Sequence, residues 1–182
     1  MNFIKTKIKD LLIIEPKIWK DDRGYFYESY NKRNFDEAGI TANFLQDNQS
    51  MSQKGTLRGL HAQSNPNAQG KLVRVIKGRV IDVAVDIRKE SETYGQHVAL
   101  ELNDDNHLML WVPPGFLHGF VTLEDDTIFT YKVTSLYNRD SEFGVLWNDP
   151  ELNIDWGIAP EEIILSEKDK VLPLFKNLIS PF

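Results

Sequence analysis

Apolar and polar residues alternate strictly through the middle of the chain, from residue 81 to residue 88. The apolar set is Ile81, Val83, Val85 and Ile87, and the residues between them are Asp82, Ala84, Asp86 and Arg88. Successive side chains of a strand point to opposite faces, so a period of two predicts a strand with one buried face. We therefore expect a strand over residues 81–88.

Other apolar runs, separated by turn residues, predict further short strands. They lie as two pieces within residues 3–15, before Pro16, and at residues 44–48, 55–63, 71–75, 97–102, 108–112, 116–123 and 127–134. We expect Lys77-Gly78-Arg79 to join two of these strands as a hairpin, and residues 104–106 to form a turn. A short helix is predicted from about Lys32 to Ala38, where Gly39 stops it, and a second helix start at Ser166.

Many short strands separated by turns are typical of a β-sandwich or a β-barrel. Residues 113–118 read Pro-Pro-Gly-Phe-Leu-His, which matches P-x-G-x-x-H, the second sequence motif of cupins. We therefore expect an all-β fold of the cupin type, a double-stranded β-helix or jelly-roll barrel with short peripheral helices. A length of 182 residues suits a single domain that spans residues 1–182.

Three polar side chains share a strand face with apolar neighbours: Lys71, Tyr131 and His118. Each is therefore predicted to point into the mouth of the barrel, where a buried polar group needs a partner or a ligand. Arg58 and His61 have opposite parity, so both can face the same pocket only if a bulge interrupts the strand near Gly59.

Composition narrows the functional classes. The formal net charge is −6, which argues against binding nucleic acid, and the chain has no cysteine. Disulfides, thiolate nucleophiles and cysteine zinc sites are thereby excluded. No apolar run approaches the ~20 residues that span a bilayer, and no signal-peptide pattern opens the chain. We expect a soluble protein of the cytoplasm, without membrane contact.

Metal chemistry has little support. Cupins normally carry H-x-H in their first motif, but the matching position here reads His61-Ala62-Gln63. Because the chain has only four histidines, a multi-histidine iron or zinc site looks incomplete, and we expect neither a metal nor a cofactor.

Other familiar catalytic motifs are missing as well. The chain has no G-x-S-x-G elbow, no P-loop and no G-x-G-x-x-G sequence. Histidine, lysine and tyrosine remain, and together they suit removal of a proton next to a carbonyl group. Such a reaction needs a base, a cation that stabilises the enolate, and an acid.

Ten segments, spread in order over nearly the whole chain, resemble the dTDP-4-dehydrorhamnose 3,5-epimerase family. These segments are Asp22–Gly24, Glu28–Asn31, Gln46–Asn48, Leu57–His61, Ala68–Arg74, Asp82–Arg88, Gly115–Phe120, Tyr131–Lys132, Trp147–Asp149 and Leu165–Asp169. The resemblance implies a metal-free jelly-roll homodimer that inverts C3 and C5 of a dTDP-4-keto-6-deoxy sugar.

The resemblance also implies roles for individual residues. His61 would take the protons from C3 and C5, and Asp169 would orient His61 and raise its basicity. Tyr131 would return a proton from the opposite face, and Lys71 would stabilise the enolate at the C4 oxygen.

Ten further residues align with substrate-binding positions of the family. These are Arg23 and Arg58 for the diphosphate, Phe26 and Glu28 for the nucleotide, and Gln46, Asp47, Asn48, His118, Glu142 and Lys168. In the family, part of the N-terminal segment reaches the pocket of the partner subunit. By that analogy, Arg23, Phe26 and Glu28 act on the partner's substrate.

Several alternatives stay open from the sequence. The enzyme could invert only C3 or only C5, the protein could bind a sugar nucleotide without catalysis, or it could be a metal-dependent cupin oxygenase. At the level of residues, Asp169 also fits a capping box with Ser166, Tyr131 fits a core tyrosine, and Lys71 and Glu142 fit solvated surface groups.

Overall fold

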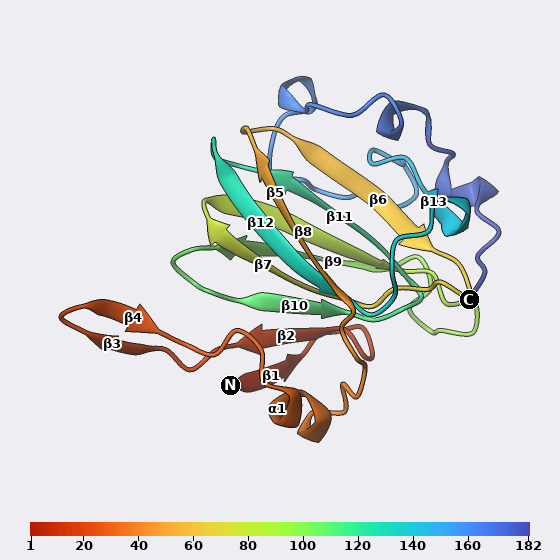
Figure 1. The fold of residues 1–182 in the computed structure, drawn as a ribbon. Coiled ribbons are helices and arrows are strands. Elements are labelled where there is room, and N and C mark those ends of the chain that lie inside the picture. The colour runs from red at the N-terminus through yellow and green to blue at the C-terminus, as the bar shows by residue number, and fades with distance from the viewer.

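The computed structural model describes residues 1–182, and its antiparallel strands form two sheets that face each other (Figure 1). The larger sheet contains, in spatial order, β1 (Asn2–Lys5), β2 (Leu12–Glu15), β10 (Met109–Val112), β7 (Lys71–Lys77), β12 (Thr127–Val133) and β5 (Gln46–Ser52). The smaller sheet contains β13 (Glu142–Gly144), β6 (Leu57–Gln63), β11 (Phe116–Thr122), β8 (Arg79–Asp86) and β9 (His97–Asn103). This arrangement confirms the predicted all-β, cupin-type jelly-roll barrel.

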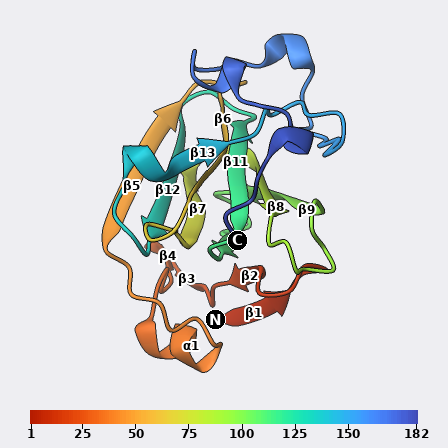
Figure 2. The ribbon, with the colours of Figure 1, turned by 90° about the vertical axis from the view of Figure 1, so that its right-hand side faces the viewer.

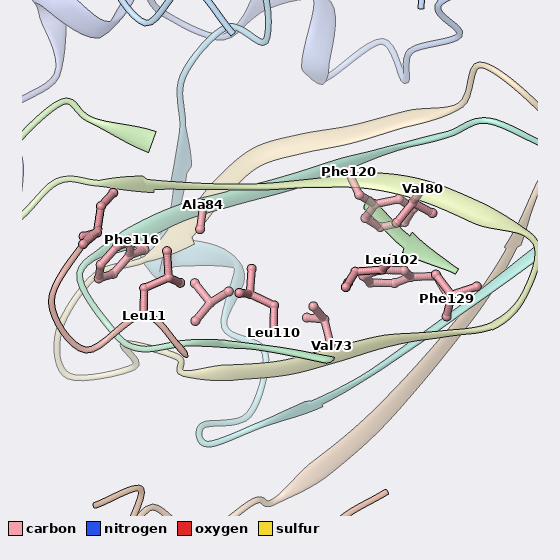
Figure 3. Packing of buried hydrophobic residues seen from close by; sticks show 12 residues of the cluster. Leu11, Val73, Val80, Ala84, Leu102, Leu110, Phe116, Phe120 and Phe129 are labelled. Atoms are coloured by element: carbon pink, nitrogen blue, oxygen red, sulfur yellow. The ribbon is translucent and has the colours of Figure 1, made fainter. Parts of the chain in front are cut away.

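The main core lies between the two sheets. Figure 3 shows its side chains, among them Val73 and Phe129 of the larger sheet and Val80 and Leu102 of the smaller one. A second cluster covers the outer face of the smaller sheet, where the C-terminal tail packs on it (Figure 2). The smaller sheet therefore has apolar side chains packed on both of its faces.

Helix α1 (Lys32–Glu37) covers the outer face of the larger sheet near β2 and β10. The side chain of Asn31 accepts a hydrogen bond from the backbone N–H of Asn34, which caps the helix start. Phe35 is fully buried in this contact. The chain leaves the helix at Ala38, and Gly39 has a φ of +86°, so the predicted helix and its stop are confirmed.

Strands β3 (Trp19–Asp21) and β4 (Gly24–Phe26) form a separate two-stranded hairpin that projects away from both sheets (Figure 1). Its aromatic side chains are exposed, and Phe26 reaches an exposure of 68%. Isolated two-stranded hairpins are only marginally stable in water. A contact between this arm and the rest of the fold is made by Tyr25, whose ring centroid lies 4.7 Å from that of His107.

Two predictions about the strands are wrong. Lys77-Gly78-Arg79 does not close a hairpin, because β7 pairs with β10 and β12 whereas β8 pairs with β11 and β9. Gly78, with a φ of +85°, instead turns the chain from one sheet into the other. The strand expected at 44–48 runs over Gln46–Ser52, because β12 pairs with all seven of these residues, six of which are polar.

The tail after β13 has no regular strand or α-helix. It contains the 3₁₀ turns η2 (Pro160–Glu162), η3 (Asp169–Val171) and η4 (Phe175–Asn177), while η1 (Arg139–Ser141) precedes β13. The predicted helix start at Ser166 is therefore a single 3₁₀ turn. Across the whole chain, no helix combines the length and the apolar character needed to cross a membrane.

Candidate active site

A cavity of about 480 Å³ opens between the two sheets at the end away from β1 and β2. Five strands and the C-terminal tail supply its walls. Among the residues that line it are Ser50, Arg58, His61, Lys71, His118, Phe129, Tyr131, Ser166, Lys168 and Asp169. Seven of the fourteen predicted site residues thus meet in one place, although they come from positions 58 to 169 of the chain.

Strand parity explains how Lys71, His118 and Tyr131 reach the cavity. Lys71 precedes the inward-facing Val73 on β7, and Tyr131 follows the inward-facing Phe129 on β12. The prediction that these polar side chains point into the barrel is confirmed. The same alternation therefore builds the apolar core at one end of the barrel and the polar cavity at the other.

A bulge brings Arg58 and His61 to the same side of β6. His61 pairs with His118 of β11, and Arg58 pairs with Phe120, so β6 has one more residue than β11 between these pairs. Gly59 lies in this interval with a φ of +142°, and a Cβ there would lie 2.5 Å from the β11 backbone. The predicted bulge near Gly59 is confirmed, and glycine is the residue that permits it.

His61 and Asp169 form a close pair. His61 Nε2 lies 2.6 Å from Asp169 Oδ1, and the carboxylate side chain is only 4% exposed. Burial opposes ionisation of Asp169, but the hydrogen bond and charge of His61 outweigh it and hold the pKa of the carboxyl below its usual value. An ionised carboxylate only accepts, so Nε2 donates and the basic lone pair of the neutral ring is on Nδ1.

The capping-box alternative for Asp169 holds only in part. The Ser166 hydroxyl accepts the backbone N–H of Asp169 at 3.2 Å, as in a capping box. The Asp169 carboxylate, however, does not reach back to the Ser166 backbone, because it is turned toward His61. One local turn thus orients the carboxylate for a long-range contact.

Burial shifts the pKa values of Lys71 and Tyr131 in opposite directions, and both groups keep their protons at neutral pH. Burial lowers the pKa of Lys71 to about 8, against the opposing charges of Asp82 and Glu142. Burial also raises the pKa of the Tyr131 phenol. At neutral pH the cavity therefore contains an ammonium and a protonated phenol. The alternative of Lys71 as a solvated surface lysine is wrong.

A second histidine–aspartate pair lies deeper in the barrel. His118 Nε2 lies 3.0 and 2.9 Å from the two carboxylate oxygens of Asp82, and Asp82 is fully buried. Burial lowers the pKa of His118, so its ring is neutral at pH 7. The expectation of one buried face for residues 81–88 is wrong, because the Asp82 face of β8 points into the barrel and the opposite face packs under the C-terminal tail.

A second cavity of about 350 Å³ adjoins the first and shares His61, Lys71 and Tyr131 with it. Its other lining residues are Gln46, Asn48, Ala62, Gln63, Gln69, Tyr137 and Glu142. Three more of the predicted site residues, Gln46, Asn48 and Glu142, thus lie in the same region.

Glu142 is held in place rather than solvated. It accepts from Lys168 Nζ at 2.7 Å and from the Tyr137 hydroxyl at 3.1 Å, and its side chain is 18% exposed. Burial raises the pKa of Glu142, but the hydrogen bond from Lys168 outweighs it and the net shift is downward. The glutamate is therefore an anion at neutral pH.

Arg58 is a cation without an acidic partner. Its guanidinium donates to the Ser52 hydroxyl at 3.4 Å from Nε and 3.3 Å from one terminal nitrogen. Ser50, on the same face of β5, has a buried hydroxyl without a hydrogen-bond partner. Free donors beside an unpaired guanidinium make this end of the cavity suited to an anion such as a phosphate.

Four predicted residues lie outside the cavity of their own chain. Arg23 and Phe26 belong to the projecting arm, where Arg23 pairs with Asp21. Glu28 follows the arm and accepts from Asn31 on the surface. Asp47 points to the opposite face of β5 from Gln46 and Asn48, and it pairs with Lys132.

Two lining residues, Ser50 and Tyr137, are not among the site residues that the sequence predicts. Asp82 is not among them either; it does not line the cavity but contacts His118, which does. The alternation of residues 81–88 predicts burial of the face opposite Asp82, so no local pattern marks this carboxylate. Across the whole chain, no group of three or more histidine, aspartate and glutamate side chains is arranged to hold a metal ion.

Comparison with known sequences identifies the family. The sequence model of the dTDP-4-dehydrorhamnose 3,5-epimerases matches residues 5–177, nearly the whole chain. The chain belongs to this epimerase family. It is 52% identical to the dTDP-4-dehydrorhamnose 3,5-epimerase of Salmonella typhimurium, over an alignment that covers 98% of each chain.

Solved structures of epimerases share this fold. A dTDP-6-deoxy-D-glucose-3,5-epimerase of Legionella pneumophila, in complex with dTDP-4-keto-L-rhamnose, is 50% identical with a TM-score of 0.93, covering 98% of this chain and 94% of that one. A 3'-monoepimerase of Streptomyces bikiniensis, in complex with dTDP-quinovose, is 29% identical with a TM-score of 0.85, covering 93% and 85%. The epimerase fold therefore extends to relatives that differ in the centres they invert.

Proposed function

We propose that the protein is a nucleotide-sugar 3,5-epimerase that converts dTDP-4-dehydro-6-deoxy-D-glucose to dTDP-4-dehydro-L-rhamnose. The observation that carries the proposal is the meeting of the His61–Asp169 pair, Lys71 and protonated Tyr131 around one cavity. Family membership and the activity in the name of the Salmonella relative also support it. The ketone at C4 acidifies the C–H bonds at both C3 and C5, so one set of groups serves two centres.

Proton removal begins the proposed reaction. Neutral His61 takes the proton from the sugar carbon, the C–H electron pair becomes the C=C bond of the enolate, and negative charge develops on the C4 oxygen. The Asp169 carboxylate stabilises the imidazolium that forms. The Lys71 ammonium stabilises the enolate oxygen, and its charge acts strongly because the site is partly shielded from water.

Reprotonation completes each inversion. Tyr131 gives its phenolic proton to the carbon from the face opposite His61, and the enolate electron pair forms the new C–H bond. The raised pKa of Tyr131 keeps the phenol protonated until that step. The His61 imidazolium then releases its proton to solvent, and the Tyr131 phenolate takes one up from solvent. A second cycle can then invert the other carbon, and neither a metal nor another cofactor is needed.

The remaining predicted residues are proposed to hold the substrate. Arg58 binds the diphosphate, because it is a guanidinium without a carboxylate partner. Gln46, Asn48, His118, Glu142 and Lys168 contact the sugar and its linkage, whereas Asp47 contributes only through the outer cavity that it lines with Asn48.

We further propose that the whole chain, residues 1–182, acts as one unit and pairs with a second copy in the cytoplasm. The arm of β3 and β4 exposes Trp19, Tyr25 and Phe26 to solvent, which is costly for a monomer. In a homodimer this arm would reach the partner, so that Arg23, Phe26 and Glu28 would complete the partner's nucleotide site. Molar mass from light scattering, with and without residues 17–28, tests this arrangement.

Product stereochemistry tests the reaction itself. The purified protein is incubated with dTDP-4-keto-6-deoxyglucose, the products are trapped by reduction, and NMR couplings are read at C3 and C5. Inversion at both centres is the expected result. Inversion at C3 alone would favour the second candidate, a single-centre epimerase, which the similarity to the Streptomyces monoepimerase makes the nearest rival.

A further inference from the structure

The charged side chain of Asp82 lies inside the barrel, where no solvent reaches it. Its neighbours two positions away on β8, Val80 and Ala84, both belong to the core cluster between the sheets. Asp82 therefore points into that interior, toward the space that the Lys71 end of β7 closes from the other sheet. Its exposure is 0%. A buried carboxylate at such a position is costly unless other groups compensate it.

The one direct partner of Asp82 does not neutralise it. Both carboxylate oxygens contact His118 Nε2, at 2.9 and 3.0 Å. Burial holds the pKa of His118 below its usual value, so the ring donates a hydrogen bond but carries no charge at neutral pH. The negative charge of Asp82 is thus available to act on other groups in the cavity.

Lys71 is a cation on which the charge of Asp82 acts. Its ammonium has no ion pair and no hydrogen bond to the protein, and it lines both cavities. Burial drives the pKa of Lys71 down to about 8, and the charges that resist this fall are those of Asp82 first and Glu142 second. Glu142 already pairs with Lys168, whereas Asp82 has no other cation.

We propose that Asp82 is a positioning residue of the active site: its carboxylate orients His118 and supplies the fixed negative charge that keeps Lys71 an ammonium. This inference rests on the proposed function, in which Lys71 must be positive to stabilise the enolate. The titratable and charged groups that surround Lys71 and share this field are Arg58, His61, Asp82, His118, Tyr131, Tyr137, Glu142, Lys168 and Asp169.

The test is the Asp82→Asn variant. The amide keeps the shape of the side chain and an oxygen that accepts from His118, so the substitution removes the charge alone. We expect the alkaline limb of kcat/KM to move to lower pH by about one unit or more, because an opposite charge nearby shifts a pKa by about 1–3 units. Activity would fall roughly tenfold above pH 9 and change little near pH 6.

Asp86→Asn is the matched control. Asp86 lies on the same strand, is equally buried, and accepts from Arg88, Ser91 and Thr93 outside the cavity. Loss of its charge should lower thermal stability without moving the alkaline limb. A shift of the limb in this control as well, or a loss of activity in Asp82→Asn that is the same at every pH, would overturn the proposal.

A second measurement does not depend on turnover. The titration of Lys71 is followed by NMR of lysine labelled with ¹³C at Cε, with Lys71→Gln used to assign the resonance. Lys71 in Asp82→Asn should titrate about one unit or more below its value in the native protein. An unchanged titration would refute the role of Asp82 even if epimerisation is found.

The pH profile of kcat/KM and the NMR titration of Lys71 distinguish a failure of the proposed function from a failure of the proposed role of Asp82. If the native protein does not epimerise the sugar, the proposed function fails while the Lys71 titration still decides the role of Asp82. If Asp82→Asn does not fold, Asp82→Ser removes the same charge with a smaller side chain and is measured in the same way.

Discussion

The barrel contains two histidine–aspartate pairs, which consist of the same two residue types but differ in their surroundings. The His61–Asp169 pair lies at the cavity wall, where the His61 side chain is 20% exposed and the tail supplies the aspartate. The His118–Asp82 pair joins two adjacent strands of the barrel interior, with side-chain exposures of 7% and 0%. We propose that the first pair exchanges protons with the substrate and that the second fixes a charge beneath it.

The two pairs differ in how burial affects the ionisation of their side chains. The pKa of His118 is lowered chiefly by loss of solvent, so its ring stays neutral and rigid at physiological pH. Asp169, by contrast, has a lowered pKa although burial opposes it, because it interacts with a histidine that can become charged. Both histidines contact an aspartate and line the cavity, but burial disfavours the charged form of His118. We therefore propose His61 as the histidine that gains a proton during turnover.

The largest expected effect comes from His61→Asn. This change removes the proposed base but keeps a polar side chain at the bulge, so the fold should persist. General base catalysis typically contributes about 10²–10⁴-fold, and kcat should fall by that amount or more. A coupled assay of product formation measures the loss. A kcat within a few-fold of the native value would contradict the role of this pair.

Tyr131→Phe should follow in size, with a loss of about 10²-fold or more in inversion. Exchange of the substrate C–H protons with solvent should decline less than inversion, because His61 is still present. Product stereochemistry and exchange are measured in the same NMR sample. Equal losses in both quantities would show that Tyr131 does not act as the acid of the second half-reaction.

Asp169→Asn should lower kcat roughly 10²-fold, because the amide neither fixes the Nε2–H tautomer nor stabilises the imidazolium. The coupled assay of product formation measures this loss.

Asp169→Asn should also alter the pH dependence of the unfolding free energy. Since the folded pKa of Asp169 lies below the unfolded value of about 3.9, its ionised form stabilises the fold above that pH. The difference in unfolding free energy between native and variant should vanish as pH falls through the lower, folded pKa; denaturant titrations from pH 7 to pH 2 measure it.

The smallest effect concerns the inner pair. Because the folded pKa of His118 lies below the unfolded value of about 6.5, the neutral ring stabilises the fold above pH 6.5 and this contribution is lost at lower pH. Tm should decline between pH 7.5 and pH 5.5, by about 2–4 °C for each kcal/mol lost. His118→Gln should have a lower Tm at pH 7.5 but a flatter pH profile. An equally steep profile in that variant would mean that other groups cause the decline.

The sequence predicted the parts of the fold that depend on local alternation. Strand parity predicts that Lys71 and Tyr131 face inward. The opposite parity of Arg58 and His61 predicts a bulge near Gly59 if both face one pocket, and the structure contains this bulge. Local patterns could also locate α1, because Asn31 and Gly39 provide its start and its end.

What the sequence could not predict depends on the pairing of distant strands. The turn at Gly78 resembles a hairpin turn, but long-range pairing sends β7 and β8 into different sheets. Asp82 was misread for a related reason, since an alternating strand with carboxylates on one face normally meets solvent there. The approach of Asp169 to His61 spans 108 positions, and only the family resemblance indicated it in advance.

Deuterium incorporation tests the contrast between the two pairs most directly. Native protein, His61→Asn and His118→Gln are each incubated with dTDP-4-keto-6-deoxyglucose in heavy water, and label is read at every ring carbon. Native protein and His118→Gln should introduce deuterium at C3 and C5, the latter more slowly, while His61→Asn should introduce none. Label at either carbon in His61→Asn, at a rate near that of the native protein, would contradict the assignment of His61 as the base.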